Sequence, residues 1–215
     1  MNRARLENFS DGVFAVAITL LALDLAVAGP GHGSLAHQLA ERWPSYAAYV
    51  VSFFIIGITW VNHHALFASF SAVDRRLLFL NLTLLLFIVA IPFGTASMAA
   101  YLTESGFDAH LAAALYAAIL EGMALSFGAI FVWSITDAER RREPLSPGEG
   151  QRALVRFSFG AIVYLVAIGV AFVSALATLI LIAVDAVYYV FEQTPVQAPV
   201  RPTRRSWPCR RRRTV

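Results

Sequence analysis

The chain has 215 residues, of which 58% are hydrophobic and only 14% are charged, and its mean hydropathy is +0.64. Soluble globular domains carry more charge, so this composition indicates a protein whose helices cross a membrane several times. All 17 basic residues are arginines, and the single cysteine, Cys209, excludes a disulfide within the chain. The chain contains no Gly-x-Ser-x-Gly motif, phosphate-binding loop, cysteine cluster or glycine-rich dinucleotide fingerprint, so the sequence indicates neither an enzyme nor a cofactor.

Six apolar segments are long enough to cross a bilayer, which requires about 20 residues per helix. They are residues 6–28, 46–70, 76–102, 108–136, 152–172 and 174–192. The last two are nearly continuous, with a boundary expected near residues 173–175, and a chain with five spans is the alternative. We therefore predict an all-α, polytopic membrane domain over residues 1–193, with six transmembrane helices.

The positions of the arginines predict the orientation of these helices. With six spans, every arginine except Arg42 lies on the same side of the membrane. Arginines accumulate on the cytoplasmic side, so both termini are expected there. Five spans would put the arginine-rich tail outside, which argues against that alternative. The first span resembles a signal peptide in its basic start and apolar centre, but Asp11 and Asp24 argue against cleavage.

Two segments outside the spans differ in composition from the rest. Residues 30–33 (Pro-Gly-His-Gly) end the first helix, and residues 34–43 are expected to form a short amphipathic helix at the outer surface. Residues 194–215 are rich in proline and arginine and are predicted to be a disordered cytoplasmic tail. A polybasic segment beside a membrane more often binds anionic lipid than nucleic acid, so we expect lipid and no nucleic acid as a partner.

The first span has two different faces. At 100° per residue, six side chains fall within one arc of about 100°: Gly12, Val16, Thr19, Leu20, Leu23 and Val27. Ser10 and Asp11 point to the opposite side. Helix packing explains most apolar stripes, and a threonine in a membrane helix commonly bonds to its own backbone, so the arc alone does not identify a function.

Polar side chains in the first two spans lie at matching depths. A charged residue inside a membrane remains only where a partner or water compensates it. Ser10 and Asp11 lie near the cytoplasmic end of the first span, and His63 and His64 near the cytoplasmic end of the second. We therefore expect a hydrogen bond from Ser10 or Asp11 to one of these histidines. Adjacent histidines diverge by 100° on a helix, so we predict no metal site at this pair.

Polar or helix-bending residues also interrupt later spans. Asn81 and Pro92 lie in the third, Glu121 in the fourth and Asp185 in the sixth. Each carboxyl is a candidate functional group, or a paired or protonated acid that faces the bundle interior. The alternative function is thus a proton- or ion-coupled secondary transporter that uses Glu121, Asp185 and the pair His63/His64. A subunit without transport activity is a third class.

Two motifs resemble those of a known family. The sequence Arg5-x-x-x-Phe9-Ser10-Asp11 opens the first span, and Trp60-x-x-His63-His64 lies in the second. Both are similar to the signatures of the transmembrane protein 175 potassium channels, and the single six-span unit looks like their prokaryotic form. The resemblance covers residues 3–192. It implies a potassium-selective leak channel of the prokaryotic plasma membrane, assembled as a homotetramer with four-fold symmetry around the first helix.

The resemblance also implies roles for individual residues. The family's apolar constriction matches Val16, its threonine layer Thr19 and a further apolar ring Leu23, with Leu20 on the same face. Val16 is shorter than the usual isoleucine or leucine, so a ring of four should be wider. A structural polar network would hold the first span without touching the ion; its members are Arg5, Phe9, Ser10, Asp11, Trp60, His63 and His64. The chain lacks the Thr-Val-Gly-Tyr-Gly filter, so moderate selectivity is expected, with potassium as the permeant ion and no bound metal.

Overall fold

The computed structural model describes residues 3–143 and 145–191, and these residues form helices without any β-strand. The α-helices are α1 (Arg3–Leu21), α2 (Leu35–Glu41), α3 (Trp43–Ala68), α4 (Arg75–Tyr101), α5 (Phe107–Ile135), α6 (Pro147–Ala171) and α7 (Ala175–Phe191). Two 3-10 helices, η1 (Ala22–Leu25) and η2 (Ala138–Arg140), follow α1 and α5. The prediction of an all-α chain is confirmed.

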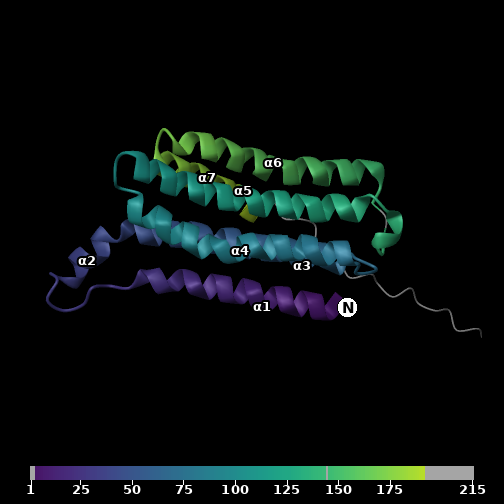
Figure 1. Ribbon diagram of the computed structural model, residues 1–215, viewed down its shortest axis with the longest axis horizontal. Helices are drawn as coiled ribbons and strands as arrows, with labels where there is room; N and C mark the ends of the chain where they lie inside the picture. Colours follow the sequence, from purple (N-terminus) through teal and green to yellow (C-terminus); the bar gives the residue numbers. More distant parts are fainter. Residues whose placement is uncertain (1–2, 144, 192–215) are drawn as a thin grey trace, which may run out of the picture.

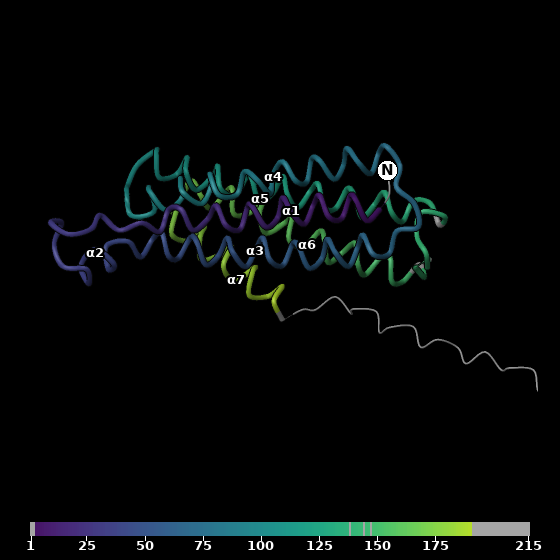
Figure 2. Tube along the Cα trace, turned by 90° about the horizontal axis from the view of Figure 1, so that it is seen from below, coloured from purple at the N-terminus to yellow at the C-terminus, as the bar shows by residue number. Residues whose placement is uncertain are grey.

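The long helices lie side by side along the long axis of an elongated bundle (Figures 1 and 2). Helix α1 lies at one edge of the bundle, where it packs against α3 and α4, whereas α5 packs against α4, α6 and α7. The start of α1 and the α3–α4 and α5–α6 connections share one end, which we call the arginine-rich end (Figure 1). Helix α2 and the α4–α5 and α6–α7 connections lie at the opposite end.

Five of the helical segments are long and apolar enough to cross a membrane: Arg3–Leu25, Trp43–Ala68, Arg75–Tyr101, Phe107–Ile135 and Gly148–Ala171. The apolar helix α7 has 17 residues, fewer than the roughly 20 that a full crossing requires. A turn at residues 172–174 separates α6 from α7, where the sequence predicted the boundary. Six crossings and two cytoplasmic termini stay predictions, and the predicted tail at residues 194–215 lies outside the described residues.

Side-chain caps decide where several helices begin. Ser146 and Glu149 form a capping box at the start of α6, with a proline at the first turn. The helix therefore begins at Pro147, five residues before the predicted start at residue 152. Ser34 caps α2, which confirms the short helix expected in residues 34–43. The buried Gln38 closes the preceding turn, because its amide bonds both the N–H and the carbonyl of Gly29.

The centre of the bundle is packed closely between α4 and α5. A Cβ atom added to Gly94 of α4 would lie 2.9 Å from Cδ1 of Ile119 and 3.2 Å from Cδ2 of Tyr116. The buried hydroxyl of Tyr116 contacts that of Ser52 on α3 (2.8 Å), which in turn contacts that of Thr95 on α4 (2.7 Å). Small residues at such contacts let membrane helices approach closely, and the hydroxyl groups bond across the helices.

Gly94→Ala is therefore expected to lower the free energy of unfolding by about 1–2 kcal/mol, because the new methyl group overpacks the contact with α5. The matched control is Gly128→Ala in α5, where a Cβ atom meets nothing within 4 Å. The control should be neutral or gain up to about 1 kcal/mol from the higher helix propensity of alanine. Thermal unfolding of both variants in the same detergent measures the difference. Equal melting temperatures would show that the contact at Gly94 tolerates the methyl group.

Backbone hydrogen bonds join the two connections at the arginine-rich end. The N–H of Ser71 donates to the carbonyl of Arg140 (2.9 Å), and the N–H of Arg142 donates to the carbonyl of Ser69 (2.9 Å). The Ser71 hydroxyl also donates to the carbonyl of Glu139. The α3–α4 and α5–α6 connections thereby fix the ends of four helices relative to one another.

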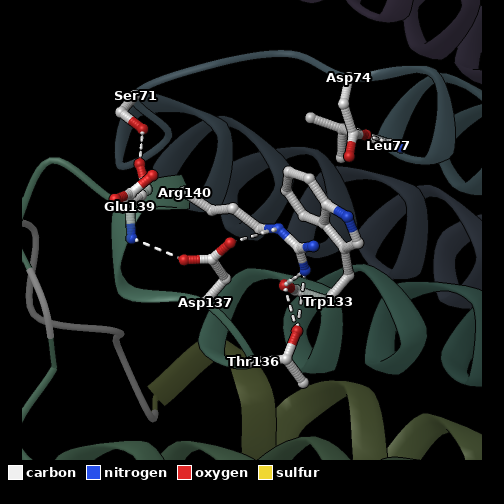
Figure 3. Close-up of polar contacts among 8 residues, drawn as sticks. All are labelled: Ser71, Asp74, Leu77, Trp133, Thr136, Asp137, Glu139 and Arg140. Atoms are coloured by element: carbon white, nitrogen blue, oxygen red, sulfur yellow. Dashed lines mark hydrogen bonds and ion pairs between the residues drawn. The ribbon is translucent and has the colours of Figure 1, made fainter.

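The side chain of Arg140 anchors these connections to α5 (Figure 3). Its guanidinium lies 4.7 Å from the centre of the Trp133 ring and donates to the Trp133 carbonyl (2.8 Å). It also donates to the Thr136 hydroxyl (2.8 Å) and lies 3.7 Å from the carboxylate of Asp137. The stacked cation and the two hydrogen bonds to the end of α5 together hold the guanidinium in one place.

Candidate functional site on the first helix

Helix α1 buries one face and leaves the other uncovered. The buried face consists of Leu6, Ser10, Phe14, Ala17 and Leu21. The uncovered face contains the six side chains that the sequence placed on one arc: Gly12, Val16, Thr19, Leu20, Leu23 and Val27. Exposure reaches 55% at Val16 and 71% at Leu23. No other described part of the protomer covers this face.

The α-helical geometry of this face ends at Leu21, and Leu23 and Asp24 lie in the 3-10 helix η1. A 3-10 helix turns by about 120° per residue, so the wheel drawn at 100° per residue does not extend to Leu23. The α-helical part of the face therefore carries Gly12, Val16, Thr19 and Leu20.

The hydroxyl of Thr19 bonds to its own helix. It donates to the carbonyl of Val16 at 2.8 Å, one turn earlier. Because the proton points at that carbonyl, the lone pairs of the exposed hydroxyl oxygen remain free to accept. The bond to the backbone therefore leaves an oxygen acceptor on the uncovered face of α1.

A directed chain of hydrogen bonds ties the buried face of α1 to α4 and α3. Nε2 of His63 lies 2.9 Å from Oδ1 of Asn81, and Nδ2 of Asn81 donates to the Ser10 hydroxyl at 3.0 Å. The Ser10 hydroxyl donates to the carbonyl of Leu6 (3.0 Å). Since an amide oxygen only accepts, His63 is the donor and carries its proton on Nε2. All three side chains are buried.

Asp11 has a different partner from the one expected. Its Oδ1 accepts a hydrogen bond from the indole N–H of Trp60 at 2.9 Å, at a half-exposed position beside the uncovered face. We expected Ser10 or Asp11 to contact a histidine directly. Instead Ser10 reaches His63 through Asn81, and the exposed His64 bonds to neither among the described residues. The ring of His63 stacks on that of Phe67 at 3.9 Å.

Side chains at the two ends of α1 are held differently. At the arginine-rich end, Arg3 donates to the carbonyls of Ala68 (3.1 Å) and Phe70 (3.2 Å) and pairs with Glu7 (3.3 Å). At the opposite end, the corresponding contact is a long hydrogen bond of 3.5 Å, which Arg42 donates to the carbonyl of Asp24. The described interhelical hydrogen bonds of α1 are thus concentrated near its start.

Comparison with known proteins identifies the family. The chain is 48% identical to a potassium channel from Streptomyces collinus over 194 residues, which cover 89% of this chain and 93% of that protein. The chain belongs to the TMEM175 family. The family profile described as endosomal/lysosomal potassium channel TMEM175 matches residues 5–92, which include both sequence motifs. The family resemblance of the sequence is therefore confirmed.

A solved TMEM175 structure has the same fold. The chain superposes with a TM-score of 0.77 on the crystal structure of a lysosomal potassium-selective channel TMEM175 homolog from Chamaesiphon minutus. The two proteins are 35% identical, and the match covers 87% of this chain and 96% of that one. A curated potassium channel from the same organism is also 35% identical, over 86% of this chain. Multi-pass helical architecture is thus common to this chain and its TMEM175 relatives.

Three residues of the TMEM175 motifs, Arg5, Phe9 and His64, lie outside the hydrogen-bonded network among the described residues. Arg5 is exposed and makes no hydrogen bond or ion pair to another described residue, whereas Arg3 binds the neighbouring helix. The ring of Phe9 is 52% exposed beside the uncovered face. Asn81 is the member that the predicted network lacked. The available signal was a polar residue inside an apolar span, the seventh residue of α4, but the sequence could not show which helices it joins.

The groups of the transporter alternative do not meet in one site. Among the described residues, His63 bonds to Asn81, Glu121 keeps a buried oxygen atom without a hydrogen-bond partner, and Asp185 has only the Tyr164 side chain beside its carboxyl. Neither carboxyl forms a salt bridge to a described residue. The described residues also contain no cluster of three or more histidine, cysteine or acidic residues that could hold a metal ion.

Proposed function

We propose that this protein is a potassium-selective leak channel of the prokaryotic plasma membrane, a homotetramer with α1 lining a central pore. The observation that carries the proposal is the uncovered face of α1 on an edge helix that bears the family motif. An edge helix of the protomer becomes central when four copies surround one axis. Two bacterial relatives named as potassium channels, from Streptomyces collinus and Chamaesiphon minutus, match nearly the whole helical domain, which supports the same activity here.

In this tetramer Val16 forms the narrow apolar ring. Side chains without coordinating groups favour a dry constriction, so an ion passes only after losing part of its hydration shell. Potassium holds its water less tightly than sodium and therefore passes at a lower cost. Leu20 and Leu23 extend the apolar surface beyond the ring, and no cofactor or resident metal is needed.

The Thr19 ring supplies the oxygen atoms in this proposal. Each hydroxyl donates its proton to the Val16 carbonyl and presents lone pairs to the pore axis. Four such oxygens partly replace the water that potassium loses at the neighbouring constriction. The selectivity that results is moderate, because hydroxyl oxygens on a helix form a looser cage than a closed carbonyl filter.

The polar network positions α1 and does not touch the ion. Ser10, Asn81 and His63 lie on the buried side of α1, away from the uncovered face. Asp11 and Trp60 add a bond beside that face. Arg5 and Phe9, which are exposed in the protomer, then meet neighbouring copies or lipid headgroups. The arginine-rich tail adds contacts with anionic lipid.

Coupled transport is the weaker alternative. A carrier that moves protons or ions in fixed stoichiometry needs titrating groups along one path. Here His63 belongs to a closed hydrogen-bond chain, and Asp185 lies on α7, which makes no substantial contact with α1. The proposed activity is passive conduction without an enzymatic step.

Thr19→Val tests the proposal, because valine keeps the shape of threonine and removes the oxygen. The potassium-to-sodium permeability ratio is expected to fall several-fold, with an unchanged oligomeric state, because the lost hydration is no longer replaced. Reversal potentials under bi-ionic conditions in planar bilayers measure this ratio. Thr83→Val on α4 is the matched control, since its exposed hydroxyl also bonds only its own backbone (3.0 Å, Phe79).

A Thr19→Val channel with the wild-type permeability ratio would contradict the role of Thr19 and leave discrimination to the apolar rings. A particle without four-fold symmetry, or saturable flux coupled to a second ion, would contradict the channel itself.

A further inference from the structure

Helix α7 carries a buried acid with no charged partner among the described residues. The side chain of Asp185 is only 3% exposed, and its carboxyl makes no hydrogen bond of regular geometry, although the Tyr164 side chain lies beside it. Ile182 and Ala186 on the same helix are buried beside it. An ionised carboxylate in such a place loses its hydration and gains no counter-ion in return, with only the Tyr164 hydroxyl to donate to it, which is unfavourable.

The groups around Asp185 are hydroxyls and apolar side chains. Tyr164 of α6 lies beside the carboxyl, Tyr189 lies one turn further along α7, and Tyr116 of α5 neighbours Tyr164. Helix α3 faces this region with Ile55 and other side chains that do not titrate. Within the described residues, no arginine or histidine lies at salt-bridge distance from Asp185.

A cavity of about 70 Å³ lies next to this acid, between α3, α5, α6 and α7. Tyr164 and Tyr189 line it together with Thr59 and Asn62, and Ala186, the residue after Asp185, also faces it. Most of its lining is apolar and it is partly open, so water molecules in it are held by the hydroxyl and amide groups of these four side chains. Tyr164, which borders both the acid and the cavity, provides a hydroxyl between them.

We propose that Asp185 is a proton-binding site inside each protomer, supplied with protons by water in this cavity through Tyr164. On binding, a proton from a hydronium ion forms an O–H bond on the carboxylate and a neutral water remains; release reverses these changes. The bound proton removes the charge that burial disfavours. The site lies away from the uncovered face of α1, so it is separate from the proposed pore.

Release of the proton is expected to loosen the packing of α7, because a charged Asp185 attracts water between α7 and α6. Tyr189 limits this opening. Its hydroxyl donates to the carbonyl of Arg156 (2.8 Å) and accepts from the N–H of Gly160 (3.1 Å), two groups that a regular helix pairs with each other. The last turn of α7, at Tyr189, thus remains attached to α6 while the segment around Asp185 becomes hydrated.

Infrared difference spectroscopy of the purified full chain tests the proton directly. At about pH 5, subtracting the Asp185→Asn spectrum from the wild-type spectrum should leave the carbonyl stretch of a protonated carboxylic acid. Asp185→Glu should retain such a band at a shifted frequency. Glu121→Gln is the matched acid-to-amide control and should retain the Asp185 band. A difference spectrum with a carboxylate band and no protonated band between about pH 5 and pH 8 would overturn the proposal.

The pH dependence of thermal unfolding gives a second readout. The native state keeps a proton that the unfolded chain has already lost, so wild-type stability falls as pH rises. Relative to Asp185→Asn, the wild-type folding equilibrium constant should drop by up to about tenfold per pH unit until the proton leaves the native state. A stability difference between the two proteins that does not change with pH would overturn the proposal. A stability difference that changes with potassium or sodium concentration at fixed pH would also overturn it, because this would indicate that the site binds a metal cation. If Asp185→Asn does not fold, the wild-type and Asp185→Glu infrared titrations carry the test.

Discussion

Val16→Asn is expected to raise the potassium conductance several-fold and to bring the potassium-to-sodium permeability ratio closer to one. An amide group keeps water at a ring that valine leaves dry, so both ions cross with more of their hydration shell. Val16 is 55% exposed on the uncovered face of α1 and contributes little to the packing of the protomer. Single-channel currents and bi-ionic reversal potentials measure the two quantities.

Val89→Asn is the control for this experiment. Val89 is similarly exposed (48%) but lies on α4, away from the proposed pore. The control channel should keep the wild-type conductance and ratio, even if lipid contact lowers its yield. Wild-type currents through the Val16→Asn channel would show that Val16 does not line the permeation path. They would also contradict the arrangement of four α1 helices around the axis.

Asn81→Leu is expected to lower the free energy of unfolding by about 2–4 kcal/mol, a large effect for one residue. Asn81 is fully buried and bonds both Ser10 and His63, so leucine leaves the His63 N–H without an acceptor. The melting temperature in detergent should fall by roughly 5–15 °C. The selectivity of the surviving channels should stay close to wild type, since this network faces away from the pore.

Ser97→Ala on the same helix is the control, because the Ser97 hydroxyl bonds only its own backbone at Phe93 (2.9 Å). Its melting temperature should change little. A stable Asn81→Leu protein with altered selectivity would contradict the structural role of the network and point to a direct role of Asn81 in permeation.

The course of the helices was predictable to within a few residues. The span expected at 76–102 is α4 at Arg75–Tyr101, and that at 108–136 is α5 at Phe107–Ile135. Long apolar runs bounded by arginine, glycine or proline carry this information locally. The larger differences are at the end of α1, which stops at Leu21 and not at residue 28, and at the start of α6, which the capping box at Ser146 places at Pro147 and not at residue 152.

The partners of polar side chains were less predictable. Periodicity identifies the face on which Ser10 lies, but not that Asn81 stands between it and His63. Arg5 belongs to the motif, yet Arg3 makes the contacts to the α3–α4 connection. These pairings depend on the rotation and depth of helices that are distant in sequence, and apolar periodicity does not encode either quantity. The roles of Val16, Thr19 and Leu23 in conduction stay predictions.

Helix α1 is hydrogen-bonded to its neighbours mainly at one end, so a tilt displaces its two ends by different amounts. The side-chain hydrogen bonds of Arg3, Ser10 and Asp11 attach its first half to α3 and α4, whereas the far half is held by the packing of its buried face and by the long contact at Asp24. Along the axis, Val16 lies about 8 Å and Leu23 about 19 Å beyond Asp11, at about 1.5 Å per residue in α1 and about 2.0 Å in η1. A tilt of about 5° about Asp11 therefore shifts Val16 by about 0.7 Å and Leu23 by about 1.7 Å, on the same axial rise. In the proposed tetramer a tilt of α1 therefore changes the pore diameter more at Leu23 than at Val16, because Val16 lies close to the attached part of the helix.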